Sequence, residues 1–282
     1  SVSRLYMSNK CLLIADHKSV DKQIHIFNKN DFSYLTSIGN FGEGPEEITV
    51  MGCLAIDEAH HQLYVSDHAK QKIFSYDMDS VMVDSLYKPQ VKTAMNETLF
   101  PSEYQYINDT LSIAVLIKPT STSTFNQFLG RWNMNTGEMI PMKYTHPDIQ
   151  KKRITFAASE KAGIYVECYT RHDLMTICSL DGELLYNIYG PDWDGGNGNK
   201  LQSFGTVMIG NDKIFVSYCG EDYARDSFPT KILVFDLEGN YLKTLETGYK
   251  ISDCCYDSFN NRIILSLNDV VQFAYLDIDG II

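Results

Sequence analysis

Two histidines that each follow an aspartate are the strongest candidates in the sequence for metal binding or acid–base catalysis. They occur as Asp16-His17 and Asp67-His68. Histidines that converge with carboxylates can ligate zinc or act as acid and base near neutral pH. A turn explains the pairs more simply, because the aspartate can cap the next residues with its side chain and the histidine is then merely the next residue. We favour the turn, since a turn recurs in a repeated structure whereas a catalytic role rarely does.

The glycine-rich stretch GNFGEGPEE at residues 39–47 could cradle a phosphate or route the chain. A phosphate loop needs its glycines at the mouth of a helix, where free N–H groups favour an anion. Here the flanking segments YLTSI and ITVMGCLAID have strand character, and the adjacent Glu46 and Glu47 would repel a phosphate. We interpret the stretch as a connector in which glycines permit positive φ and Pro45 stiffens the turn.

A second polar stretch, GPDWDGGNGN at residues 190–199, is similar in composition to a calcium loop. An EF-hand register would place Asn197 where glycine is required and Ser203 where glutamate is required, so we interpret the stretch as a long connector. Trp193 on it is a candidate contact for a sugar or a protein, since tryptophan often anchors interfaces. We expect no cofactor, with Ca²⁺ as the alternative.

Composition excludes several classes of function. The formal charge of −12 argues against a nucleic-acid or anionic-membrane surface, and the nearest basic patch, Lys151-Lys152-Arg153, is interpreted as a solvated loop. The sequence has no run of 18 apolar residues, so we expect no transmembrane segment. The seven cysteines form no CxxC pair and are typical of small buried hydrophobes. The motifs GxSxG, HExxH and the P-loop are absent.

Six similar apolar pentads recur along the chain. They are LLIAD, LYVSD, LSIAV, IYVEC, IFVSY and IILSL, and they end at residues 16, 67, 115, 168, 218 and 267. Successive copies are therefore 48 to 53 residues apart. A second strand-like run follows each pentad, and an outer run such as YLTSI at 34–38 or SVMVDSL at 80–86 comes after several of them. Another apolar stretch precedes each pentad, so each copy holds four short strands.

This pattern predicts an all-β fold, a six-bladed β-propeller with four antiparallel strands per blade, forming a single domain over residues 1–282. The first copy has its innermost strand at Val2–Tyr6. The last copy ends at Ile281-Ile282, before an outer strand. We therefore expect the sixth blade to be closed by a strand that is short, missing or supplied from upstream of Ser1.

Two stretches carry a family resemblance. The segment LAIDEAHHQLYVSDHAKQKIFSYD at 54–77 resembles an NHL-type propeller repeat. The segment IGNFGEGPEEI at 38–48 resembles the Gly-x-Gly-Pro-x-Glu connector of TolB-like six-bladed propellers, which are abundant in the envelopes of Gram-negative gut anaerobes. Such proteins are often exported lipoproteins of unassigned function. The resemblance therefore implies a periplasmic or cell-envelope location with a leader upstream of Ser1, and it implies no particular reaction.

Ligand sites of propellers usually gather where the loops between second and third strands meet the connectors between blades. Sorting the sequence by this rule gives a set of candidate binding residues at the channel mouth. They are His17, Glu46, Glu47, His68, Glu103, Arg153, Arg171, His172, Trp193 and Asp253.

We expect a non-catalytic, monomeric binding module whose acidic top face engages a protein, a peptide or a glycan. The alternative is a divalent-metal hydrolase or lactonase in which carboxylates such as Glu47, Glu103 and Asp253 surround a channel ion. A third class is a structural spacer within a larger envelope assembly. Metal analysis separates the first two classes, because only the hydrolase requires a bound ion.

Overall fold

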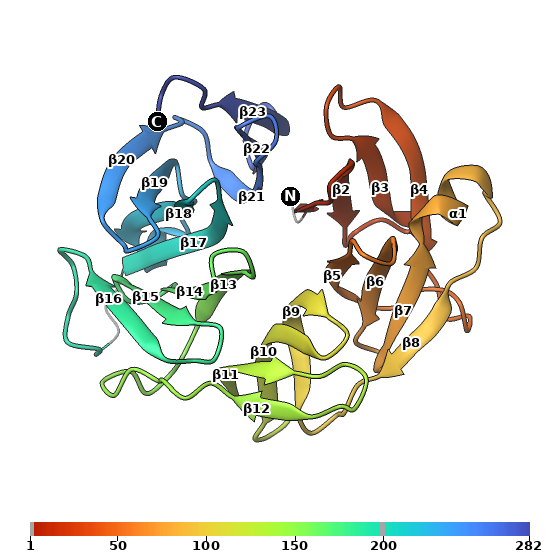
Figure 1. The fold of residues 1–282 in the computed structure, drawn as a ribbon, viewed down its shortest axis with the longest axis horizontal. Helices are drawn as coiled ribbons and strands as arrows, with labels where there is room; N and C mark the ends of the chain where they lie inside the picture. Colours follow the sequence, from red (N-terminus) through yellow and green to blue (C-terminus); the bar gives the residue numbers. More distant parts are fainter. Residues whose placement is uncertain (1–2, 198–200) are drawn as a thin grey trace. The chain divides into compact units, whose positions relative to one another are not determined.

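The alternating apolar pattern of the six repeats folds into six antiparallel sheets in the computed structural model, which describes residues 3–197 and 201–282. The six pentads lie in the second strands of these sheets, as the repeat predicts. Contacts divide the chain into two compact units, Val2–Pro141 and Met142–Ile282, with three sheets in each (Figure 1). Every sheet is a meander whose neighbouring strands follow one another in sequence. The prediction of six β-propeller blades is confirmed.

The unit Val2–Pro141 holds blades 1 to 3. The strands of blade 1 are β1 (Ser3–Met7), β2 (Cys11–Asp16), β3 (Lys22–Asn28) and β4 (Tyr34–Asn40). Those of blade 2 are β5 (Met51–Asp57), β6 (Gln62–Asp67), β7 (Lys72–Asp77) and β8 (Gln90–Ala94). Those of blade 3 are β9 (Phe100–Asn108), β10 (Leu111–Pro119), β11 (Phe125–Trp132) and β12 (Met139–Pro141).

The unit Met142–Ile282 holds blades 4 to 6. The strands of blade 4 are β13 (Ile154–Ser159), β14 (Ile164–Tyr169), β15 (Leu174–Ser179) and β16 (Leu184–Tyr189). Those of blade 5 are β17 (Leu201–Gly210), β18 (Lys213–Asp222), β19 (Lys231–Asp236) and β20 (Tyr241–Glu246), with the 3₁₀ turn η1 (Tyr223–Arg225) after β18. Those of blade 6 are β21 (Ile251–Asp257), β22 (Arg262–Leu267) and β23 (Phe273–Asp277).

The core lies between neighbouring blades. All six residues of β14 are buried, whereas no residue of the outer strand β16 is. The second strands of blades 2 and 5 are covered on both faces by other blades of their own unit, so they read as continuous apolar runs, whereas the outer strands meet water. Separate apolar clusters join blades 1 and 2, 2 and 3, 4 and 5, and 5 and 6. Each large side chain buried there contributes about 1.5–3 kcal/mol.

One predicted strand is wrong. The run SVMVDSL at 80–86 was expected to be the outer strand of blade 2, but Met78–Val83 form the short helix α1, and β8 supplies the outer strand instead. The cause is local, because the Asp77 carboxylate accepts the backbone N–H groups of Asp79 and Ser80 at 3.0 Å each and so caps a helix. Val81 then packs into the core between blades 1 and 2.

The sixth sheet contains only three strands among the residues that the structure describes, in agreement with the expected incomplete last blade. Within the same described ranges, no helix has the length and apolar character needed to cross a membrane. All seven cysteines are buried and free.

Candidate functional site

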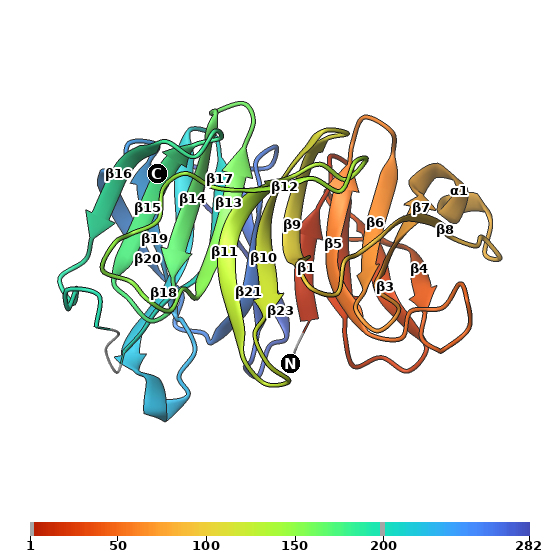
Figure 2. The same cartoon turned by 90° about the horizontal axis from the view of Figure 1, so that it is seen from below.

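Blades 4 and 5 bring three distant segments together at one end. Ile154 at the start of β13 pairs with Tyr169 at the end of β14, so the connector that enters β13 lies beside the loop that leaves β14. The register of blade 5 places Leu201 opposite Asp222 in the same way. We call this the connector end of a blade. The long β17–β18 hairpin reaches beyond the neighbouring strands there (Figure 2).

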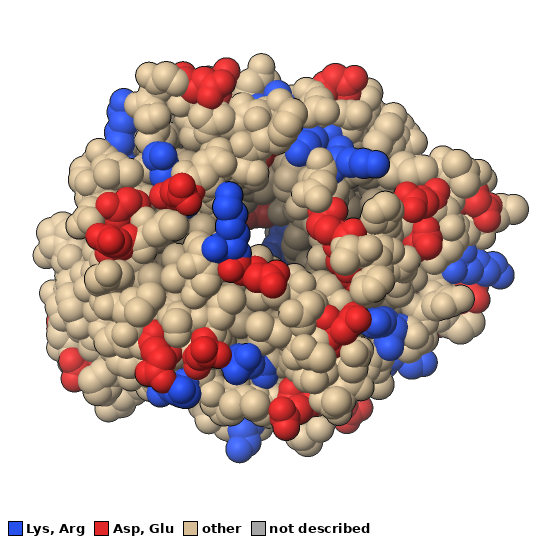
Figure 3. All heavy atoms as spheres, in the orientation of Figure 1, with Lys and Arg blue, Asp and Glu red and all other residues tan. Residues whose placement is uncertain are grey.

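A cavity of about 720 Å³ opens at the connector end of blades 4 and 5. Its lining residues, which we call the basic pocket, are Asp148, Gln150, Lys151, Arg153, Thr170, Arg171, His172, Gly196, Asn197 and Tyr223. Lysine and arginine outnumber carboxylates three to one in this lining, although the chain as a whole has 36 acidic and 24 basic residues. On the face drawn in Figure 3, by contrast, the two signs are interspersed. The predicted acidic character therefore does not describe this cavity.

A buried ion pair fixes the connector that carries two of the basic residues. Lys152 Nζ lies 2.6 Å from Glu167 Oε2, and the two side chains are 11% and 1% exposed. Burial raises the pKa of Glu167, and the ammonium of Lys152 opposes that rise. Interpretation of this basic run as a solvated loop is thus wrong for Lys152. Its anchoring holds the neighbouring Lys151 and Arg153 at the pocket.

Arg171 is held by an aromatic ring. The centre of its guanidinium group lies 3.9 Å from the ring centre of Tyr223, a cation–π contact that orients the planar group. Tyr223 begins η1, whose cap is the Asp222 carboxylate accepting the backbone N–H of Ala224 at 2.9 Å. The β14–β15 loop of blade 4 and the η1 turn of blade 5 therefore together position the guanidinium group of Arg171 in the pocket.

Trp193 packs behind the pocket in a cluster of aromatic rings. Its ring centre lies 5.0 Å from that of Tyr189, 5.2 Å from that of His146 and 6.1 Å from that of His172. His146 Nδ1 accepts the backbone N–H of Asp148 at 3.2 Å, so its Nε2–H donates to the Tyr189 hydroxyl at 2.9 Å. Trp193 thus joins two connectors and the β14–β15 loop, rather than projecting as an exposed anchor.

Two buried ionisable groups follow Arg171 in the chain. His172 is 5% exposed, its Nδ1 has no hydrogen-bond partner within the described residues, and burial lowers its pKa. Asp173 accepts the backbone N–H of Asp192 at 2.9 Å and the Tyr218 hydroxyl at 3.1 Å, and burial raises its pKa. A Cβ on Gly190 would lie only 2.1 Å from this carboxylate, so the connector needs a glycine there.

The histidines of the two Asp-His pairs both approach Gly52 on β5. His17 Nε2 donates to the Gly52 carbonyl at 3.3 Å, and His68 occupies the space where a Cβ of residue 52 would lie 2.1 Å from its Nε2. Burial lowers the pKa of His68. The Asp67 carboxylate accepts backbone N–H groups, as the turn interpretation predicts.

The two glutamates of the glycine-rich connector have partners close by. Glu47 folds back so that Oε2 accepts the backbone N–H of Gly44 at 2.8 Å, and a Cβ on Gly42 would lie 2.0 Å from that same oxygen. Glu46 forms an exposed ion pair with Lys88 at 3.4 Å. The glycines of this loop therefore make room for the carboxylate of Glu47.

The other two candidate metal ligands are also bound within their own units. Glu103 on β9 pairs with Arg4 on β1. Asp253 on β21 accepts the Thr206 hydroxyl of β17 at 2.9 Å. A metal at these carboxylates would have to compete with such partners, and the metal hydrolase stays a prediction.

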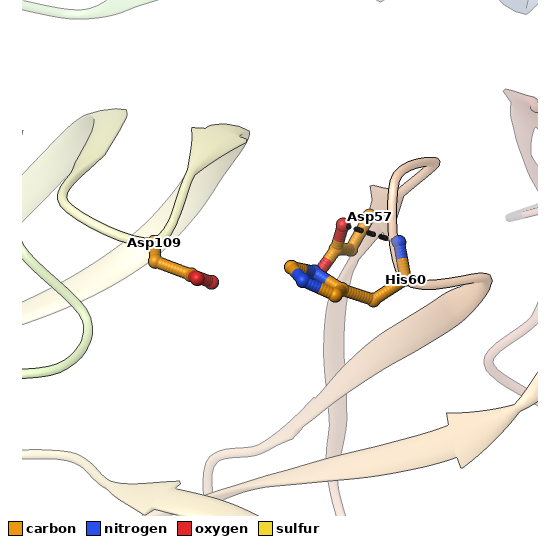
Figure 4. A group of neighbouring side chains, drawn as sticks. All are labelled: Asp57, His60 and Asp109. Carbon is orange, nitrogen blue, oxygen red and sulfur yellow. Dashed lines mark hydrogen bonds and ion pairs between the residues drawn. The ribbon is translucent and has the colours of Figure 1, made fainter.

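A different group of potential metal ligands lies in blades 2 and 3, at the end of each blade away from its connectors. Asp57, His60 and Asp109 have ligand atoms within 4.8 Å of one another, and Asp109 faces the imidazole from the β9–β10 turn (Figure 4). Asp57 Oδ2 accepts His60 Nδ1–H at 2.8 Å and the Tyr64 hydroxyl at 2.8 Å. The hydrogen bond from His60 to Asp57 raises the pKa of His60.

In blade 6, Asp257 and Asn260 stand where blade 2 has Asp57 and His60, and asparagine is a poor metal ligand. Asp257 Oδ2 accepts the side-chain N–H of Asn260 at 2.7 Å, and its Oδ1 accepts the Asn260 backbone N–H at 3.1 Å. In blade 2 the backbone N–H of His60 reaches Asp57 Oδ1 at 3.2 Å. The Asp57–His60 contact is therefore a recurrent turn, one that alignment of the Asp-x-x-His and Asp-x-x-Asn stretches could have revealed.

Comparison with known proteins supports the fold. Residues 1–129 match a family model, DUF5128, described as a 6-bladed beta-propeller. Curated proteins give no match. A DUF4221 family member from Bacteroides vulgatus superposes with a TM-score of 0.62 at 10% identity, covering 98% of this chain and 92% of that one. A protein of unknown function from Bacteroides caccae gives 0.55 at 12% identity, covering 97% and 92%.

The β-propeller domain of Cps50 (Swd1) from Myceliophteria thermophila superposes with a TM-score of 0.62 at 9% identity, covering 98% of this chain and 95% of that one. At such identities the likeness concerns the fold alone. Together with the six sheets and the family model, it identifies the chain as a six-bladed β-propeller.

Proposed function

We propose that this protein is a non-catalytic binding module that engages a glycan in the basic pocket. The observation that carries the proposal is the cavity itself, whose volume of about 720 Å³ falls within the range of roughly 300–1,000 Å³ typical of small-ligand sites. Asp148, Gln150, Thr170 and Asn197 add hydrogen-bond donors and acceptors to the lining. Sugar hydroxyls both donate and accept, so they suit such a mixture.

A binding role also agrees with the hydrogen bonds that nearby ionisable groups form within the protein. Both ring nitrogens of His146 form hydrogen bonds within the protein. Asp173 is occupied by Asp192 and Tyr218. These groups hold the connectors in place, which supports a preorganised site rather than an acid–base pair. A peptide is a poorer fit, because beyond the rings of His172 and Tyr223 the lining offers little apolar surface for its side chains.

A filled-pocket variant tests the proposal. Asn197→Trp places a bulky side chain in the lining without changing charge, and Lys161→Trp, on the β13–β14 turn at the other end of blade 4, is the control. We expect the purified protein and the control to retain at least one member of an immobilised library of neutral and acidic glycans, and the Asn197→Trp protein to lose it. Retention of no glycan, or equal retention by all three proteins, would contradict the proposal.

We further propose that the protein works in the bacterial cell envelope, because residues 38–48 resemble the connector of TolB-like propellers. Fractionation of host cells followed by immunodetection should place it with periplasmic or membrane markers. Recovery with cytoplasmic markers alone would refute the location without bearing on the pocket.

A further inference from the structure

The basic pocket is positively charged, whereas the chain as a whole is negatively charged. Lys151, Arg153 and Arg171 line one cavity in a protein with a formal charge of −12, and Asp148 is the single carboxylate among the lining residues. Basic side chains that share a cavity repel one another, and a bound anion reduces that repulsion. The lining therefore points to a negatively charged ligand.

The structure also fixes where the two arginine charges lie. Arg171 is stacked on Tyr223, and an Arg153 Nη donates to the Lys152 carbonyl at 2.7 Å. Lys152 is itself anchored on buried Glu167. Side chains held in this way lose less conformational entropy when a ligand arrives. The guanidinium group presents a planar fork of donors that matches a carboxylate with two parallel hydrogen bonds.

The cavity is larger than a simple anion requires. A volume of about 720 Å³ leaves room around the charge for a ring with several hydroxyl groups, which Gln150, Asn197 and Thr170 can meet with donors and acceptors. We propose that the ligand is an acidic saccharide, a chain of uronic acid units, with its carboxylates bound by Lys151, Arg153 and Arg171. This inference rests on the proposed glycan-binding function and adds the charge of the ligand.

Calorimetry with defined probes tests the inference. The probes are tetragalacturonate, the same tetrasaccharide with every carboxylate methyl-esterified, and hexaglutamate as an acidic peptide. We expect the acid to bind and the neutral ester to bind at least about tenfold more weakly, because a charge-assisted hydrogen bond contributes about 1.5–3 kcal/mol. Raising NaCl from about 50 to 500 mM should also weaken binding, since exposed charges are screened.

Two pocket variants and one matched control locate the effect. Lys151→Gln and Arg171→Gln should each weaken tetragalacturonate binding by about tenfold to a hundredfold. Lys161→Gln removes one positive charge from the β13–β14 turn and should leave affinity unchanged. Thermal unfolding of each variant checks that the fold persists.

Three results would overturn the inference. They are equal binding of the acid and its ester, a preference for hexaglutamate, and absence of tetragalacturonate binding. If the glycan library still shows retention that Asn197→Trp abolishes, the proposed function survives while the acidic ligand is wrong. If the library shows none, both fail.

Discussion

Replacement of Asp67 by alanine should destabilise the protein more than the same change at Asp16, although both residues end the second strand of their blade. The Asp67 carboxylate is fully buried. It accepts four backbone N–H groups, those of Thr49 at 2.8 Å, Ala69 at 3.0 Å, and Val50 and Lys70 at 3.2 Å each. Asp16 accepts one, from Lys18 at 3.0 Å, and is only partly buried.

The two shortest hydrogen bonds of Asp67 set the magnitude. A hydrogen bond to a charged acceptor contributes about 1.5–3 kcal/mol, so losing two of them should lower the free energy of unfolding by about 3 kcal/mol or more. One exposed turn bond at Asp16 should contribute about 1 kcal/mol. We expect Asp67→Ala to unfold at a clearly lower urea concentration than Asp16→Ala, with the same slope m.

Circular dichroism against urea concentration is the assay, and Asp67→Asn serves as a third variant because it keeps one acceptor oxygen in place. Its midpoint should lie between those of the parent and Asp67→Ala. Equal midpoints for Asp67→Ala and Asp16→Ala would refute the reasoning, since they would show that the bonds from Thr49 and Val50 do not bind the blade 1–blade 2 connector to β6.

Two further predictions concern histidines in the unit Val2–Pro141. Burial lowers the pKa of His68 from its ordinary 6.5, so the unfolded chain takes up the proton first and stability should fall as pH drops through 6.5. His68→Gln should reduce this acid-induced loss between about pH 7.5 and 5.5 in urea unfolding, and an unchanged pH profile would contradict the assignment. His60→Asn should leave the free energy of unfolding within about 0.5 kcal/mol of the parent value, because Asn260 makes the same contacts in blade 6. If the variant instead loses a metal detected by elemental analysis in the parent, the Asp57–His60–Asp109 group is a metal site.

The regular elements were predictable because they repeat. The apolar pentads mark second strands that pack against neighbouring blades of the same unit, and such burial leaves a similar local pattern in each copy. The helix α1 escaped prediction because a single cap at Asp77 outweighed an apolar run typical of a strand.

The candidate site was predictable only in part. Placing connectors and second-to-third loops at one end of the blade grouped Arg153, Arg171 and His172, and these three residues line one cavity; whether they bind a ligand stays a prediction. The same rule gave Glu46 and Glu47 equal weight, and it could not show that one pairs with Lys88 and the other folds onto Gly44. A side chain's direction depends on partners that loop position does not specify.

The sequence by itself determined the number of blades, the four-strand pattern and the routing role of GNFGEGPEE, because alternation and turn residues act over a few neighbouring positions. Only the tertiary structure decided that an acidic chain carries a basic pocket. Lys151 and Tyr223 are about 70 residues apart in the sequence, yet both line one cavity. The buried Lys152–Glu167 pair holds the loop of Lys151 in place, and the stacking of Arg171 on Tyr223 holds the loops of these two residues together. The net charge of a site depends on side chains from loops of different blades, and a local sequence pattern does not show which loops come together.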